Sequence, residues 1–107
     1  MECFKIIWSK RSLNDIETII LFYESANVST SIKTRVELLI SEVDRLAQFP
    51  FLGQKELYLE EENGDFRYVH HEHLKAIYAV HKSESAIEII AVFDVRQNPD
   101  KLKKKDF

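Results

Sequence analysis

The residues of this chain best suited to chemistry on a phosphate group lie in its second half. Arg67, Lys75 and Arg96 are cations, and each belongs to a different strand-like segment. An arginine side chain matches phosphate oxygens and stays protonated, so it can stabilise the negative charge that develops when a phosphodiester bond is cleaved. If these three strands are neighbours and the side chains share a sheet face, they form a compact positive site. We therefore take the three residues as the candidate catalytic set.

A tyrosine and a histidine could complete such a site. Tyr78 could stack on a base or hold a phosphate group. A histidine can act as general acid or base near neutral pH, and His71 is the candidate, inside the cluster of His70, His71 and His73. The cluster could bind a metal only with ligands from elsewhere in the chain. We therefore expect no metal and no cofactor, and any cleavage of a phosphodiester would be metal-free.

The same residues also have structural interpretations. Arg67 could form ion pairs across a hairpin with the glutamates at 60–62, although exposed pairs contribute little stability. Lys75 fits a solvated lysine on a strand, and Tyr78 fits a core residue with its hydroxyl group at an edge. Arg96 is open between the two interpretations, because Arg-Gln-Asn-Pro ends a strand where an exposed site could lie.

Length and composition predict one domain over residues 1–107. The chain has 45% hydrophobic residues and a single cysteine, Cys3, so an internal disulfide is excluded. Cys3 and Trp8 are expected in the core. No apolar run reaches the roughly 18–20 residues of a membrane helix, and the N-terminus lacks the features of a signal peptide. We expect a cytoplasmic protein that does not bind membranes.

The charge is negative overall and uneven along the chain. The net charge is −3, yet residues 101–107 form a short basic tail with four lysines. The rest of the chain has 11 basic and 17 acidic side chains, which is the wrong sign for an autonomous nucleic-acid binder. A contact with nucleic acid would need a local patch or the tail, where Lys101 to Lys105 could meet a phosphate backbone.

Hydrophobic periodicity predicts an α+β fold. The segment 2–8 reads as a strand with apolar residues on both faces, which suggests a central position in the sheet. Apolar residues then recur at helical spacing over 10–25 and again from Ile32 to Leu46, and Pro50 ends the second helix. We expect these helices to form a hairpin on one face of a mainly antiparallel sheet. The later strands are predicted at 56–60, 66–71, 74–81 and 86–93.

Four stretches, in this order, are similar to the RelE/ParE superfamily of toxins from type II toxin–antitoxin (plasmid stabilisation) modules. Together they cover nearly the whole chain. They are the opening strand with Trp8-Ser9 and the helix bearing Asp15-Ile16 and Tyr23, the stretch Leu46-Ala47-Gln48-Phe49-Pro50-Phe51-Leu52-Gly53, the pair Phe66-Arg67-Tyr68-Val69 and Lys75-Ala76-Ile77-Tyr78, and the closing Val92-Phe93-Asp94-Val95-Arg96-Gln97-Asn98-Pro99.

The resemblance implies an α+β toxin fold, a cognate antitoxin as partner, and growth inhibition in a bacterial cell. Two activities are implied: inhibition of DNA gyrase, or ribosome-dependent cleavage of mRNA as an endoribonuclease. Leu74 stands where the family often has an aromatic residue, and the acidic charge differs from that of ribosome-acting relatives. We therefore favour a non-catalytic inhibitor and keep the ribonuclease and a non-toxic binding module as alternatives. A homodimer is left open.

Within that hypothesis, two surfaces are assigned to two partners. Phe22, Tyr23 and the exposed face of the second helix would contact the target. The sheet groove with Arg67 and Arg96 would take an acidic or amphipathic segment of the antitoxin.

Overall fold

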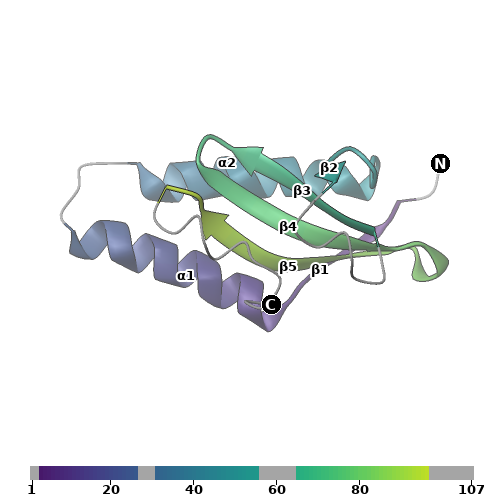
Figure 1. The fold of residues 1–107 in the computed structure, drawn as a ribbon, viewed down its shortest axis with the longest axis horizontal. Helices are drawn as coiled ribbons and strands as arrows, with labels where there is room; N and C mark the ends of the chain where they lie inside the picture. Colours follow the sequence, from purple (N-terminus) through teal and green to yellow (C-terminus); the bar gives the residue numbers. More distant parts are fainter. Residues whose placement is uncertain (1–2, 27–30, 56–64, 97–107) are drawn as a thin grey trace.

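The computed structural model describes residues 3–26, 31–55 and 65–96. Two helices and a five-stranded sheet make up this part of the chain, which confirms the α+β prediction (Figure 1). The first half holds β1 (Lys5–Trp8), α1 (Lys10–Ser25), α2 (Ile32–Asp44) and a 3-10 turn, η1 (Arg45–Ala47). The second half holds β2 (Gln54–Lys55), β3 (Asp65–His71), β4 (Leu74–His81), the 3-10 turn η3 (Lys82–Glu84) and β5 (Ala86–Asp94).

The strands are arranged in the order β1-β5-β4-β3-β2. Among these five described strands, the β1–β5 pair is parallel and the other neighbours are antiparallel. The first strand is therefore at an edge of the sheet, and the prediction of a central position was wrong. Its apolar side chains misled the periodicity argument, because Ile7 faces solvent on the side away from the helices while Ile6 and Trp8 pack against the core.

Both helices lie on one face of the sheet and run in opposite directions, as expected for a helical hairpin (Figure 1). Ser9 caps α1, because its hydroxyl oxygen accepts a hydrogen bond from the backbone N–H of Ser12. The buried side chains of α2 follow the predicted four-and-three spacing and meet the sheet. Together with α1 they form the main core, whose helical members are Ile19, Tyr23, Ile32, Val36, Leu39 and Val43.

Alternation along the strands sorts the sheet residues between its two faces. In β4, Ala76 and Tyr78 belong to the core under the helices, whereas Ile77 belongs to a smaller cluster on the other face with Ala91 and Phe93. We call this second side the outer face. A register shift between Ile77 and Tyr78 gives β5 one extra residue, Ile90, so the alternation on β5 is interrupted and Ile89 and Val92 both belong to the core under the helices.

Among the described residues, no strand pairs with the half of β5 that extends past β1, and the start of α1 bonds to it instead. The Ser9 hydroxyl donates to the Ile90 carbonyl oxygen at 3.0 Å, and the Asp15 carboxylate accepts from the Val92 N–H at 2.9 Å. These side chains occupy backbone groups that would otherwise form an open edge. They also fix the position of α1 along the sheet.

Two of the expected segments lie outside the described residues, and Cys3 is not where it was expected. The strand predicted at 56–60 and the basic tail at 101–107 lie outside the described residues, and β2 precedes the former at Gln54–Lys55. Cys3 is exposed, so its expected place in the core was wrong, while Trp8 packs partly buried against the core. Among the described helices, none is long and apolar enough to cross a membrane.

Candidate functional site

Arg67 and Tyr78 act on the same segment, the loop of residues 50–53 that follows the second helix. They are partners in the β3–β4 register, so their side chains share the helix-facing side of the sheet. Arg67 Nη1 donates to the carbonyl oxygens of Phe51 at 3.2 Å and of Gly53 at 3.0 Å, and the guanidinium group lies 5.1 Å from the Phe51 ring centroid. Both residues thus hold a loop in place.

Tyr78 makes the second half of this clamp. Its side chain is completely buried; the hydroxyl donates to the Pro50 carbonyl oxygen at 3.0 Å and accepts from the Gly53 N–H at 2.9 Å. Gly53 is required by space, because a Cβ atom there would lie 2.5 Å from the Tyr68 carbonyl oxygen. The structural interpretation of Tyr78 is the one that these contacts support, with its hydroxyl group used inside the protein.

Lys75 is on the opposite side of the sheet from Arg67. Its ammonium group lies over the Tyr68 ring, 4.0 Å from the centroid, and His70 is its register partner on β3. The His70 ring is tilted beside the same tyrosine, with 6.3 Å between centroids. The expectation that Arg67, Lys75 and Arg96 share one face was therefore wrong. Arg67 pairs with Tyr78, and Lys75 lies three positions before Tyr78 on β4, so the side chains of Arg67 and Lys75 are on opposite faces of the sheet.

Arg96 lies at the end of β5, beside the last turns of α1. Its backbone N–H donates to Asp94 Oδ1 at 3.1 Å, and Nη2 lies 3.5 Å from the Tyr23 hydroxyl oxygen. The Tyr23 hydroxyl donates to the other carboxylate oxygen of Asp94, which is buried. Burial, followed by the hydrogen bond to Asp94, raises the pKa of Tyr23. The hydroxyl is therefore a proton donor that holds a buried carboxylate, and Arg96 borders this pair.

This geometry changes the surface assigned to Tyr23. Its side chain is buried, so the expectation that it contacts a target directly was wrong. Its neighbour Phe22 is 51% exposed and packs edge-on against the Tyr23 ring, with centroids 5.4 Å apart. Phe22 remains available to a partner, and Tyr23 supports it from beneath.

His71 lies beside the turn between β3 and β4. Among the described residues, no contact joins it to another candidate residue. Its Nε2 atom is 3.3 Å from Glu72 Oε2, and the same oxygen lies 3.4 Å from Arg35 Nε of the second helix. The arrangement links this turn to α2. No group of three or more potential metal ligands occurs among the described residues.

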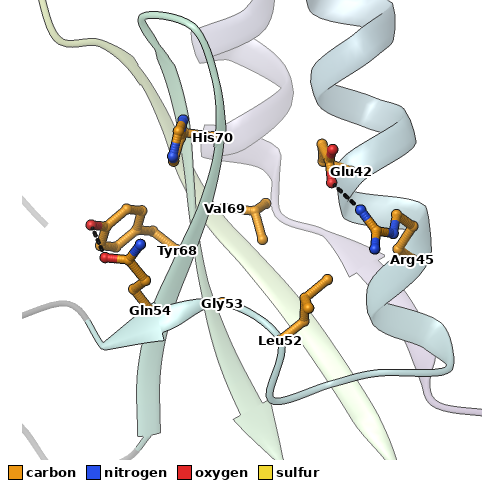
Figure 2. A pocket seen from close by; sticks show the side chains of 8 residues that line it. All are labelled: Glu42, Arg45, Leu52, Gly53, Gln54, Tyr68, Val69 and His70. Atoms are coloured by element: carbon orange, nitrogen blue, oxygen red, sulfur yellow. Dashed lines mark hydrogen bonds and ion pairs between the residues drawn. The ribbon is translucent and has the colours of Figure 1, made fainter.

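A shallow open pocket lies where the end of α2 approaches β3 (Figure 2). Its volume is about 330 Å³, and each wall carries a polar pair: Arg45 Nη1 with Glu42 Oε2 at 3.0 Å, and the Tyr68 hydroxyl with Gln54 Oε1 at 2.8 Å. Arg67, Lys75 and Arg96 are absent from its lining. The lining residues are Glu42, Arg45, Leu52, Gly53, Gln54, Tyr68, Val69 and His70.

The arrangement as a whole suits binding more than acid–base chemistry. Metal-free RNA cleavage requires a base, charge-stabilising donors and an acid within reach of one phosphate group. Arg67 faces the helices, Lys75 lies on the outer face, and Arg96 is at the end of β5.

The cluster of Tyr23 and Asp94 was missed at the sequence level. Asp94 at the end of an apolar strand was its available signal, because a carboxylate there needs a donor.

The fold defined by these contacts is that of a small α+β protein in which a helical hairpin covers one face of a five-stranded sheet. A family model described as the ParE toxin of the type II toxin–antitoxin system, parDE, matches residues 6–99. The chain belongs to this family, and the resemblance to type II toxins is confirmed. A search of curated proteins finds no matching relative.

Proposed function

We propose that this toxin inhibits DNA gyrase in the bacterial cytoplasm without cleaving RNA, and that a cognate antitoxin holds it inactive. The observation that carries the choice of a non-catalytic mechanism is the separation of the candidate cations. Arg67 is bonded to two carbonyl oxygens of the 50–53 loop, while Lys75 lies on the other face over Tyr68. A phosphate group could not meet both. The family match supports a toxin and an antitoxin partner.

The surface that we assign to the target is the exposed side of the helices near Phe22. Aromatic side chains contribute strongly to protein interfaces when they become buried there. Phe22 is half exposed and rests on Tyr23, whose hydroxyl group is fixed by Asp94. The ring is thus presented on a rigid base, which lowers the entropy lost on binding.

The test combines two measurements on the purified protein and on induced cells. Supercoiling by purified gyrase should fall when the toxin is added, and mapping of RNA 5′ ends after induction should reveal no new cuts. Phe22→Ser should weaken the inhibition at least tenfold. Leu13→Ser is the matched control, because Leu13 is an equally exposed apolar residue of α1, at 54%, near the other end of that helix. Unaltered gyrase activity at saturating toxin would refute the proposal.

A ribosome-dependent endoribonuclease is the second candidate, and one observation favours it. Tyr68, His70 and Lys75 lie on the same outer face, where a ring, an imidazole and a cation could meet a base and a phosphate. Codon-linked cuts in the 5′-end map, lost in Lys75→Met, would establish this function instead. Normal growth on expression of the folded chain alone would indicate a binding module without toxicity.

A further inference from the structure

Three exposed apolar side chains come from one short turn after the second helix. Phe49, Phe51 and Leu52 are each between 43% and 52% exposed, and the Leu52 N–H closes the turn by donating to the Phe49 carbonyl oxygen at 3.0 Å. Leu52 also lines the pocket between α2 and β3 (Figure 2). Single exposed apolar side chains need no explanation, but a group of them marks a surface for a partner. We call residues 49–52 the apolar turn.

Two cations border this turn at Phe51. The Arg67 guanidinium group lies 5.1 Å from the centroid of the Phe51 ring, and the Lys82 ammonium group lies 5.8 Å from it. Lys82 is exposed, while Arg67 is partly buried. The surface at the turn is therefore apolar with a positive border. A complementary partner surface carries carboxylates beside apolar side chains.

The bonds that hold the turn use its backbone and leave its side chains outside. Arg67 donates to the carbonyl oxygens of Phe51 and Gly53, and the Tyr78 hydroxyl donates to that of Pro50. The clamp therefore fixes the positions from which the apolar side chains project. A surface that is fixed before it meets its partner loses less entropy on binding.

We propose that the apolar turn is a second surface through which this toxin contacts gyrase, at an acidic and partly apolar area of the gyrase surface. This inference rests on the proposed function. Lys82 lies in η3, just before β5 begins, whereas Phe22 packs on Tyr23, which bonds to Asp94 at the last residue of β5 (Figure 1). The nine residues of β5 place the two surfaces about 25–30 Å apart. A large folded protein such as gyrase can contact both at once.

A second copy of this chain fits the apolar turn less well. In a twofold contact a surface patch meets the same patch of its partner, so Arg67 and Lys82 would approach identical cations. Like charges brought together at an interface oppose binding. An acidic partner avoids this repulsion, and its contact with the turn should weaken as salt concentration rises.

Binding of purified gyrase to the full-length toxin tests the apolar part of this surface. Phe51→Ser should weaken binding and the inhibition of supercoiling at least tenfold. The clamp uses the Phe51 carbonyl group, so the variant should keep its fold, which circular dichroism checks. Leu13→Ser, which removes an exposed apolar side chain from α1, is the control and should stay within about threefold.

A second pair of variants tests the positive border. Lys82→Glu should weaken gyrase binding at least tenfold, whereas Lys10→Glu, which makes the same charge change at an exposed lysine of α1, should stay within about threefold. Equal binding by each variant and its control would overturn the proposal, and a loss of inhibition in Phe22→Ser would then leave the proposed function standing.

Other partners of the apolar turn would be recognised in the same experiments. Phe51→Ser that binds gyrase normally but binds the protein of the neighbouring reading frame weakly would assign the turn to the antitoxin and overturn the proposal. A toxin dimer that is lost in Phe51→Ser would assign the turn to a second copy, with the same consequence. If the unaltered toxin does not bind gyrase, both this inference and the proposed function fail.

Discussion

Replacement of Tyr78 by phenylalanine removes one oxygen atom from the clamp on the 50–53 loop. The hydroxyl group bonds to the Pro50 carbonyl oxygen at 3.0 Å and to the Gly53 N–H at 2.9 Å, and Gly53 is itself buried. Phenylalanine fits the same space, so the change is confined to hydrogen bonding. It leaves one backbone donor and one acceptor without their partner.

The expected loss of stability follows from the number of orphaned groups. A buried donor or acceptor left without a partner costs about 1–3 kcal/mol. Since the Pro50 carbonyl oxygen is part-buried, we expect Tyr78→Phe to lower the free energy of unfolding by about 3 kcal/mol in total. With a urea m-value of about 1.5 kcal/mol/M, the unfolding midpoint should fall by about 2 M.

Tyr68→Phe is the matched control, because it removes the same atom from the preceding strand. The Tyr68 hydroxyl donates to Gln54 Oε1 at 2.8 Å, but this bond is exposed, so water replaces it and the loss should stay below about 1 kcal/mol. Urea unfolding followed by circular dichroism measures both variants, and equal m-values would show that the comparison is sound. A loss for Tyr78→Phe within 0.5 kcal/mol of the control would refute the clamp as a major contributor.

Three further variants test other contacts, again by unfolding measurements. Gly53→Ala forces a methyl group against a backbone carbonyl oxygen 2.5 Å away and should destabilise the fold by more than about 2 kcal/mol; wild-type stability would contradict the close approach. In the wild type, the raised pKa of Tyr23 means that its contribution is complete below the unfolded pKa of about 10 and is lost as pH rises through the folded pKa. Tyr23→Phe should lack this alkaline loss and should also destabilise at neutral pH, because the buried Asp94 carboxylate loses a donor; an unchanged alkaline profile would refute this assignment. Asp15→Ala orphans a backbone N–H of β5 and should cost about 1–2 kcal/mol, whereas Glu17→Ala, an exposed acid of the same helix, should be near neutral, and equal losses would contradict the role of Asp15.

Periodicity predicted the fold because each helix carries one apolar stripe and the later strands are bounded by clear turns. It failed for β1, where four consecutive residues gave no information about neighbours in the sheet. Edge and central positions differ in hydrogen bonding, and Ile7 shows that an apolar side chain can be tolerated on the exposed face of an edge strand. The parallel pairing of β1 with β5 joins the two ends of the described chain, which local patterns cannot reveal.

The candidate site was harder to predict because it depends on strand parity. Residue types pointed to Arg67, Lys75 and Arg96, of which Arg67 and Lys75 lie in strands and Arg96 follows the end of β5, but a common face requires matching register across the strands. A single odd offset places Lys75 on the outer face and Arg67 beneath the helices. The clamp was not predictable in the same way, since the Pro50–Gly53 turn reads as a helix stop and gives no sign that a tyrosine 25 residues later bonds to it.

The surroundings of the basic side chains connect the structure with the proposed function. Among the described residues, four basic side chains lie over aromatic rings: Arg11 over Phe93, Arg67 and Lys82 over Phe51, and Lys75 over Tyr68. To bind a phosphate group tightly, each of these cations would have to leave its ring, at a cost of about 0.5–2 kcal/mol. These four side chains are therefore poorly placed to bind a nucleic acid, while the half-exposed phenylalanine on α1 suits a protein partner.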